Sequence, residues 1–375
     1  MTALLPHIDP DGLLEYSVVY TDRALNHMSA RFQTAMRDIS GLLKQVYHAD
    51  AVAIVPGSGT FAMEAVARQL AQDQSCLVVR NGFFSFRWSQ ILEMGNISRQ
   101  VTVMNAQAAA GSQQPFAPAP IEAVCAAIAE QRPAVVFAPH VETASGMMLP
   151  DSYIRRLADA VHAVGGLLVI DCIASGTVWL NMQALGIDVL ISAPQKGWSG
   201  SPCCGMVMLS EAAVARVNDT QSSSFACDLK KWLHIMQAYE NGGHAYHATM
   251  PTDALLVLRD VMQEAERIGF EALKTAQLQL GQDVRDLLAE YGYASVAAAD
   301  FAAPGVVVCY TDDADIHSGK AFARHGVQIA AGVPLQVGEP AGFQTFRIGL
   351  FGLDKLQNPA RTVASLRQAL DEIRA

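Results

Sequence analysis

The chain has 375 residues, of which 51% are hydrophobic and 17% charged, so it is long enough to bury large cores in two domains. A formal net charge of −10, without any basic run, argues against nucleic acid or an anionic membrane as the main partner. The start of the chain lacks the order of a signal peptide, and no apolar run approaches about 18 residues. The seven cysteines show no CxxC pair and no zinc-type spacing, so we expect a cytoplasmic protein with reduced thiols and no metal site.

The first half of the chain alternates between strand and helix patterns after an N-terminal arm over residues 1–30. The predicted elements are helix 32–47, strand 51–55, helix 61–70, strand 76–80, helix 86–94, strand 101–104, helix 121–130, strand 134–138, helix 151–164 and strand 167–171. This alternation predicts crossover units and a mostly parallel sheet. Residues 106–120, rich in Ala, Gln, Gly and Pro, are expected to form a surface loop.

The second half continues with strands and helices of the same kind, interrupted by one long helical stretch. The predicted elements are strands 189–192 and 204–209, helices 211–217 and 228–238, strands 306–310 and 346–350, and a final helix 359–373. A long helical stretch runs from Pro251 to Tyr291, and Gly269 and Gly281 are expected to break it. We therefore predict an α/β fold with a large domain over residues 31–265 and a small domain over residues 266–375.

One lysine stands in a polar loop between two apolar strands. The loop covers residues 193–202 and contains Lys196, and twenty-five residues upstream an apolar run ends abruptly in Asp171. Alone, each could be ordinary, a solvated lysine and a helix-start acid. Together they are the pair that a pyridoxal phosphate enzyme needs, because the lysine holds the cofactor as a Schiff base and the acid keeps the pyridine nitrogen protonated.

A glycine turn follows the first strand and opens a helix, which is a phosphate-binding geometry. The turn contains Gly57 and Gly59, and with Ala62 it also satisfies the loose dinucleotide pattern G-x-G-x-x-A. Arg80 ends the next strand, where an NADP enzyme could hold a phosphate. An NADP-linked oxidoreductase is therefore an alternative, although it leaves the lysine and the aspartate unexplained.

Seven separated motifs occur in an order that resembles one enzyme family. They are Gly57-Ser58-Gly59-Thr60, Asn81-Gly82-Phe83-Phe84, Glu142-Thr143-Ala144-Ser145-Gly146, Asp171, Gln195-Lys196, Tyr246-His247-Ala248-Thr249-Met250-Pro251 and Phe346-Arg347-Ile348-Gly349. From about residue 33 to the C-terminus the chain resembles the class V aminotransferases of fold type I, closest to the alanine–glyoxylate and serine–pyruvate branch.

The resemblance assigns a role to each motif around pyridoxal 5′-phosphate. Lys196 would carry the cofactor and later move the substrate proton, and Asp171 would pair with the pyridinium. Phe84, which follows a turn and could equally be a packing residue, would stack on the ring. Thr143 would hydrogen-bond the ring hydroxyl.

The resemblance also implies where anionic groups are held. The phosphate would be cradled by Ser58, Gly59, Thr60 and Gln195. Tyr246 and Thr249 would reach the phosphate of a neighbouring subunit, which implies a homodimer with shared sites. Arg347 would grip the substrate carboxylate in a bidentate pair.

The implied function is a ping-pong transfer of the amino group of alanine or serine to glyoxylate or pyruvate. A pyridoxal phosphate-dependent lyase or an aminophosphonate transaminase of the same superfamily remains an alternative. Two departures from the family pattern concern specificity. Residues 15–20 replace a Gly-Pro-Gly-Pro-like turn that helps wall the substrate pocket, and the bulky Trp198 is expected to narrow or cover the site.

Overall fold

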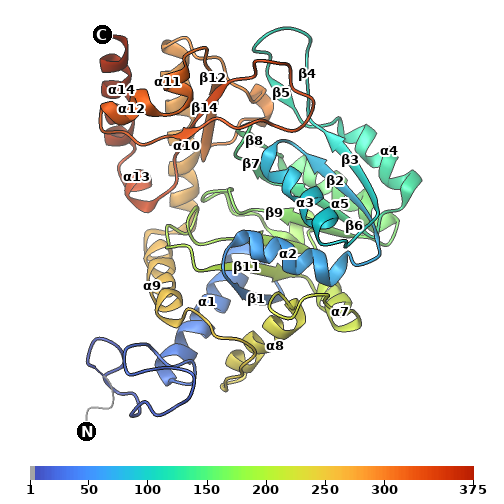
Figure 1. Ribbon diagram of the computed structural model, residues 1–375, viewed down its shortest axis with the longest axis vertical. Helices are drawn as coiled ribbons and strands as arrows, with labels where there is room; N and C mark the ends of the chain where they lie inside the picture. Colours follow the sequence, from blue (N-terminus) through green and yellow to red (C-terminus); the bar gives the residue numbers. More distant parts are fainter. Residues whose placement is uncertain (1–4) are drawn as a thin grey trace.

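The computed structural model describes residues 5–375, and its centre is a seven-stranded sheet in the order β1-β11-β10-β9-β6-β2-β3 (Figure 1). The strands are β1 (Ala51–Pro56), β2 (Ser75–Arg80), β3 (Gln100–Asn105), β6 (Val135–Pro139), β9 (Leu167–Asp171), β10 (Val189–Ser192) and β11 (Cys204–Leu209). Strand β11 runs opposite to the other six strands, and all pairs without it are parallel, so the sheet is mostly parallel, as predicted. Strands β9, β10 and β11 are buried along their whole length, which explains their unbroken apolar sequences.

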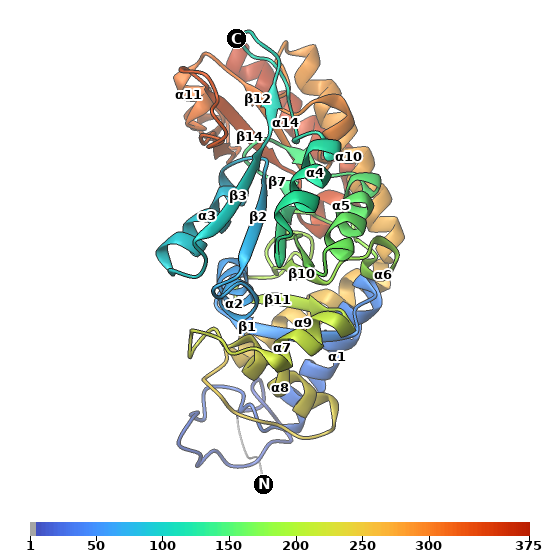
Figure 2. The ribbon, with the colours of Figure 1, turned by 90° about the vertical axis from the view of Figure 1, so that its right-hand side faces the viewer.

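Helices cover both faces of this sheet, and Figure 2 shows α4 and α5 on one side of β2 and β3 with α3 on the other. The helices of this part are α1 (Ala30–Tyr47), α2 (Gly59–Leu70), α3 (Phe83–Met94), α4 (Ile121–Gln131), α5 (Asp151–Ala163), α6 (Met182–Leu185), α7 (Glu211–Asp219) and α8 (Leu229–Glu240). Helices α2 and α3 begin before their predicted starts at residues 61 and 86, because their first turns face the sheet edge and carry no apolar period.

Two helices lead from the large sheet to the C-terminal part of the chain. Helix α9 (Thr252–Ile268) ends at Gly269, whose φ of 102° breaks the helix as predicted. The expected break at Gly281 is wrong, since α10 (Phe270–Glu290) continues through it. A Cβ atom at Gly281 would lie 2.5 Å from the Cα of Pro304, so this glycine serves close packing.

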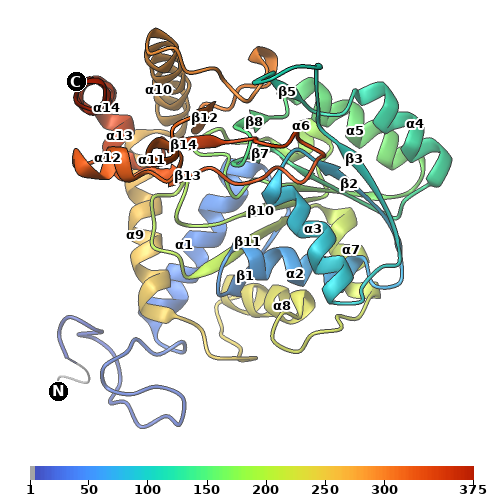
Figure 3. The same ribbon diagram turned by 45° about the horizontal axis from the view of Figure 1, so that its top comes forward.

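The C-terminal part contains its own three-stranded sheet in the order β12-β14-β13. Its elements are a 3₁₀ turn η1 (Ala299–Phe301), β12 (Val306–Tyr310), α11 (Ala314–His317), α12 (Lys320–Arg324), β13 (Ala330–Ala331), β14 (Thr345–Gly349), α13 (Leu353–Gln357) and α14 (Pro359–Arg374). Figure 3 shows β12 and β14 next to the hairpin of β7 (Val141–Glu142) and β8 (Met147–Met148). The expected surface loop over residues 106–120 also contains a two-stranded ladder, β4 (Gln107–Ala108) and β5 (Phe116–Ala117).

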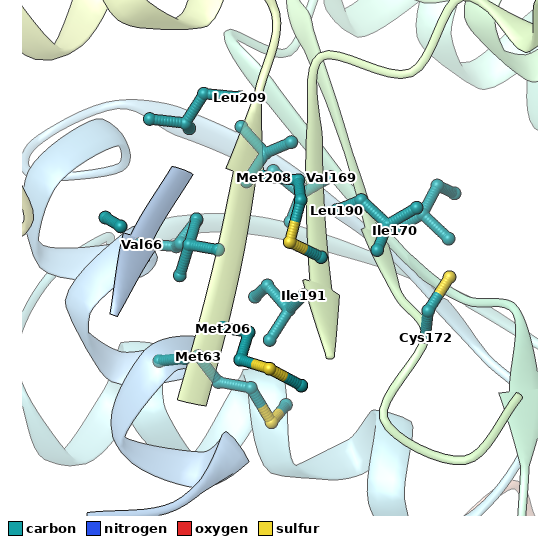
Figure 4. Close-up of a cluster of buried hydrophobic side chains, with 14 of the residues drawn as sticks. Met63, Val66, Val169, Ile170, Cys172, Leu190, Ile191, Met206, Met208 and Leu209 are labelled. Atoms are coloured by element: carbon teal, nitrogen blue, oxygen red, sulfur yellow. The ribbon is translucent and has the colours of Figure 1, made fainter. Parts of the chain in front are cut away.

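The buried apolar side chains form clusters, two of which are drawn from consecutive parts of the chain. One cluster of buried side chains is drawn from residues 8–262, and a second is drawn from residues 265–370. Figure 4 shows part of the first, where Met206 and Met208 of β11 pack beside Ile191 of β10 and Met63 of α2. A third cluster joins buried side chains of residues 106–174 to those of residues 296–335. The separation of the first two clusters is what a domain boundary near residue 265 requires, and the boundary itself stays a prediction.

The N-terminal arm contains no helix or strand over residues 5–29. It is tied to the start of α9, because the hydroxyl of Tyr20 donates to the carbonyl of Met250 at 3.2 Å and the Leu25 N–H donates to Asp253 at 3.0 Å. Within residues 5–375 no helix is long and apolar enough to span a bilayer.

Candidate active site

A cavity of about 350 Å³ opens at the carboxyl ends of the parallel strands and is also lined by residues of the C-terminal part. Most of the residues singled out in the sequence lie on its wall: Ser58, Gly59, Thr60, Phe84, Thr143, Asp171, Gln195, Lys196 and Arg347. Tyr246 and Thr249 do not line it. The carboxyl edge of a parallel sheet is where α/β proteins bind their ligands.

Lys196 lies in the loop between β10 and β11, held close to the body of the protein. A Cβ atom at the neighbouring Gly197 would lie 2.0 Å from the carbonyl oxygen of Gly176, so only glycine fits there. The Lys196 amine lies 5.1 Å from the centre of the Phe351 ring. Burial, together with the charge of Arg347, lowers the pKa of Lys196. The lowered pKa favours the neutral amine, which is the nucleophilic form.

Asp171 ends β9 as a buried carboxyl group, 7% exposed. It accepts one hydrogen bond, from the N–H of Ile173 at 2.9 Å. Burial, together with the charge of Glu142, raises the pKa of Asp171 to about 7. Among residues 5–375 no Lys, Arg or His nitrogen lies within 4 Å of it. The carboxyl group is therefore placed to pair with a cation that a ligand supplies.

The buried Glu142 fixes the other side of the cavity, a role that the sequence reasoning missed. Its carboxylate accepts the N–H groups of Ser85 at 2.8 Å, Phe84 at 3.2 Å and Ala144 at 3.0 Å. It thereby caps the N-terminus of α3 and sets the positions of Phe84 and Thr143. Burial raises the pKa of Glu142. The only signal in the sequence was the density of hydrogen-bonding side chains after β6.

The glycine turn has the geometry of an anion site. Gly57 has a φ of 121°, its N–H donates to the carbonyl of Cys203 at 3.0 Å, and α2 begins two residues later. The Ser58 side chain makes no capping hydrogen bond to α2, so its hydroxyl is available to a ligand. A Cβ atom at Gly59 would lie 2.5 Å from Cδ1 of Ile173. The absence of that side chain leaves the backbone N–H groups of the first helical turn open to an anion.

Arg347 projects from β14 on the opposite wall. Its Nε donates to the carbonyl of Ala331 at 2.8 Å, and its guanidinium carbon lies 5.6 Å from the centre of the Phe84 ring. No carboxylate within the described residues comes within 4 Å of it. Its terminal N–H groups can therefore hold a planar anion with two parallel hydrogen bonds.

Two further residues line the cavity although the sequence reasoning passed over them. Arg87 lies one helical turn after Phe84, and its Nη1 donates to Oγ1 of Thr60 at 2.9 Å. Phe351 lies two residues after the end of β14. Helical spacing from Phe84 was the signal that could have indicated Arg87.

Several expectations about the surroundings of the site need correction. Trp198 neither narrows nor covers the cavity, because it is fully buried beside Trp179 at a ring distance of 4.8 Å. Residues 15–20 belong to the arm and do not line this cavity. Arg80 does not line it either, since its guanidinium donates to the carbonyl of Gln336 and to Ser89.

The motif residues Tyr246 and Thr249 lie outside the cavity, on the surface. Their hydroxyls are 3.1 Å apart and Tyr246 is 51% exposed. Within residues 5–375 no cluster of three His, Cys, Asp or Glu side chains is placed to hold a metal ion. His140, the residue after β6, is hydrogen-bonded to Ser175 at 2.7 Å.

The mostly parallel sheet with its lysine loop at the carboxyl edge is the architecture of the fold type I pyridoxal phosphate-dependent transferases. Alanine–glyoxylate aminotransferase from Nostoc sp. superposes with a TM-score of 0.75 at 23% identity, covering 94% of this chain and 89% of that one. Pyridoxamine–pyruvate aminotransferase from Mesorhizobium loti superposes with a TM-score of 0.78 at 19% identity, covering 94% and 87%.

The family model for class-V aminotransferases matches residues 12–343, and the chain belongs to that family. The 2-aminoethylphosphonate–pyruvate transaminase of Pseudomonas fluorescens is 27% identical over 337 residues, 88% of this chain and 86% of that protein. The enzyme of the same name from Burkholderia mallei is 29% identical over 333 residues, 86% and 84%. The protein is therefore a transaminase dependent on pyridoxal phosphate, and the NADP-linked alternative is wrong.

Proposed function

We propose that this transaminase moves the amino group of a small amino acid, of the alanine or serine type, to a small 2-oxo acid such as glyoxylate or pyruvate. The observation that carries the proposal is the convergence of Lys196, Asp171 and Arg347 on one cavity of about 350 Å³. The volume limits the substrate, because the cofactor must share this space.

The residues on the wall fit pyridoxal phosphate. The open glycine turn suits the phosphate, with neutral donors from Ser58, Gly59, Thr60 and Gln195. Within residues 5–375 no side-chain cation lies within 4 Å of the buried carboxyl of Asp171, which suits the pyridine nitrogen. Phe84 suits the ring face, and Thr143 suits the ring hydroxyl. When bound, the cofactor supplies an electron sink for the bonds at the substrate α-carbon.

Three side chains of the protein would then have separate roles in the amino-group transfer. The amine of Lys196, whose pKa is lowered by burial, would move the proton between the substrate α-carbon and the C4′ carbon of the cofactor. Arg347 holds the carboxylate of the substrate and so fixes which α-carbon bond faces the ring. Asp171 keeps the pyridine nitrogen charged.

An aminophosphonate transaminase is the second candidate. The relatives from Pseudomonas fluorescens and Burkholderia mallei carry that activity in their names. The two terminal nitrogens of Arg347, with their four N–H bonds, accommodate a phosphonate as well as a carboxylate. A desulfurase-type lyase is less well supported, because none of the seven cysteines lines the cavity.

The half-reaction tests these functions directly. The loaded enzyme would be mixed, without an oxo acid, with alanine, serine or 2-aminoethylphosphonate, and the loss of the visible cofactor band followed by stopped flow. Rapid loss with alanine or serine, restored by glyoxylate or pyruvate, supports the first function. Rapid loss with 2-aminoethylphosphonate alone supports the second, and a band that no amine bleaches would contradict both.

We also propose that the protein is a cytoplasmic homodimer in which Tyr246 and Thr249 serve the partner's site. Exposed aromatic side chains support it, since Phe225, whose ring lies 4.6 Å from that of His247, is 78% exposed, and Phe61, the residue after Thr60, is 50% exposed. All seven cysteines are free thiols, in keeping with a reducing compartment.

A further inference from the structure

We infer that Arg87 is the cationic ligand of the cofactor's phosphate, acting beside Thr60. The inference rests on the proposed position of the phosphate at the glycine turn. Arg87 lies on α3, three residues after Phe84 and on the same face, and it lines the cavity. Its Nη1 donates to Oγ1 of Thr60 at 2.9 Å, which brings the guanidinium to the first turn of α2.

The charge balance of the cavity requires such a cation. A phosphate monoester carries about −1.5 to −2 charges at neutral pH. The residues proposed to cradle it are all neutral: Ser58, Gly59, Thr60 and Gln195. The N-terminus of α2 adds about half a positive charge. A buried anion of this charge needs a further cationic partner.

Three cationic side chains line the cavity within the described residues, and two have other duties. Lys196 forms the covalent link to the cofactor and cannot also neutralise the phosphate. Arg347 lies on the β14 wall, tied to the carbonyl of Ala331. Arg87 is the cation that directly contacts a residue of the phosphate turn.

The guanidinium of Arg87 still has hydrogen-bonding capacity. Among residues 5–375 it forms no ion pair within 4 Å, and the hydroxyl of Thr60 uses one of its five N–H groups. Its carbon lies 5.3 Å from the centre of the Phe84 ring, which holds the planar group in place. The remaining N–H groups can bind phosphate oxygens in the bidentate manner that suits arginine.

The test compares pyridoxal phosphate with pyridoxal, which lacks the phosphate. Cofactor-free wild-type protein, Arg87→Gln and Arg87→Lys would be titrated with each compound, and dissociation constants read from the visible band. We expect Arg87→Gln to weaken pyridoxal phosphate binding about 10- to 100-fold, the usual loss for a charged hydrogen bond, with a smaller loss for Arg87→Lys. Pyridoxal should bind all three proteins within about twofold of one another.

The matched control is Arg155→Gln, which removes an exposed arginine of α5 and should change neither constant. Equal weakening of both compounds by Arg87→Gln would overturn the inference, because Arg87 would then shape the ring site. Unchanged cofactor binding with a raised KM for an amino acid that has a second acidic group would assign Arg87 to the substrate and also overturn it. Cofactor binding is measured without turnover. A failure of the proposed transamination would therefore not change the binding result, and the two failures can be told apart.

Discussion

The carboxyl group of Asp171 is buried in the cofactor-free protein, where no ligand supplies a cation to it. Its pKa, raised by burial from 3.8 to about 7, means that folding favours its protonated form. As the pH rises from about 4 to about 7, the unfolded chain loses this proton first, so the free energy of unfolding of the cofactor-free protein falls. Asp171→Asn removes this penalty.

The stability difference between the two cofactor-free proteins is measurable by thermal unfolding across that pH range. We expect the stability of Asp171→Asn relative to the wild type to increase steadily as the pH rises, with little difference at the acidic end. Added pyridoxal phosphate should reverse the order, because its ring cation pairs with the aspartate alone. A difference that does not vary with pH would contradict the burial of an unpaired carboxyl group at this position.

Residues at strand ends were the predictable part of the site. Asp171 and Lys196 follow the apolar runs of β9 and β10, and parallel strands end at one edge of a sheet. Glu142 and Arg87 could not be assigned in this way, because their roles depend on how α3 packs beside α2 and β7. That packing is a tertiary contact between segments separated by tens of residues, and no local pattern encodes it.

At the scale of elements, two glycines inside helices provide a matched pair. Gly281 of α10 approaches Pro304 so closely that an added Cβ would lie 2.5 Å from its Cα, whereas Gly41 of α1 has no atom within 4 Å of that position. Gly41→Ala should raise the free energy of unfolding by about 0.5–1 kcal/mol through helix propensity. Gly281→Ala should lower it by about 1–3 kcal/mol through overpacking.

Urea denaturation of both variants checks this pair. Equal stabilisation by the two alanines would show that α10 does not pack on Pro304 as described. The same contact explains why the expected helix break at Gly281 was wrong. The sequence alone does not distinguish a glycine that ends a helix from one that allows another segment to pack closely on the helix. Most other element boundaries followed from apolar periodicity, which marks the faces that pack on the sheet.

At the scale of the whole molecule, the surface positions of Tyr246 and Thr249 fit a site completed by a second subunit. Lys196→Ala chains mixed by co-expression with Tyr246→Ala/Thr249→Ala chains would give some dimers with one intact site. If these residues act across an interface, the mixture should regain about a quarter of the wild-type rate, although each variant alone is inactive.

A mixture that stays inactive while forming mixed dimers would place Tyr246 and Thr249 outside the partner's site. The control is wild-type protein co-expressed with the Lys196→Ala chain. In the sequence only the family resemblance pointed to a shared site, since an interface is formed by surface residues whose complement lies on another copy. The layered α/β arrangement, by contrast, followed from the order of strands and helices.

We expect the amine of Lys196 to form the bond to pyridoxal phosphate at the carboxyl edge of the sheet. Borohydride reduction of the loaded protein fixes that bond, and peptide mass mapping then locates it. We predict that the cofactor's mass appears on the peptide containing Lys196 and that Lys196→Ala shows neither the visible band nor a labelled peptide. A label on any other lysine, or a visible band that persists in Lys196→Ala, would contradict the account.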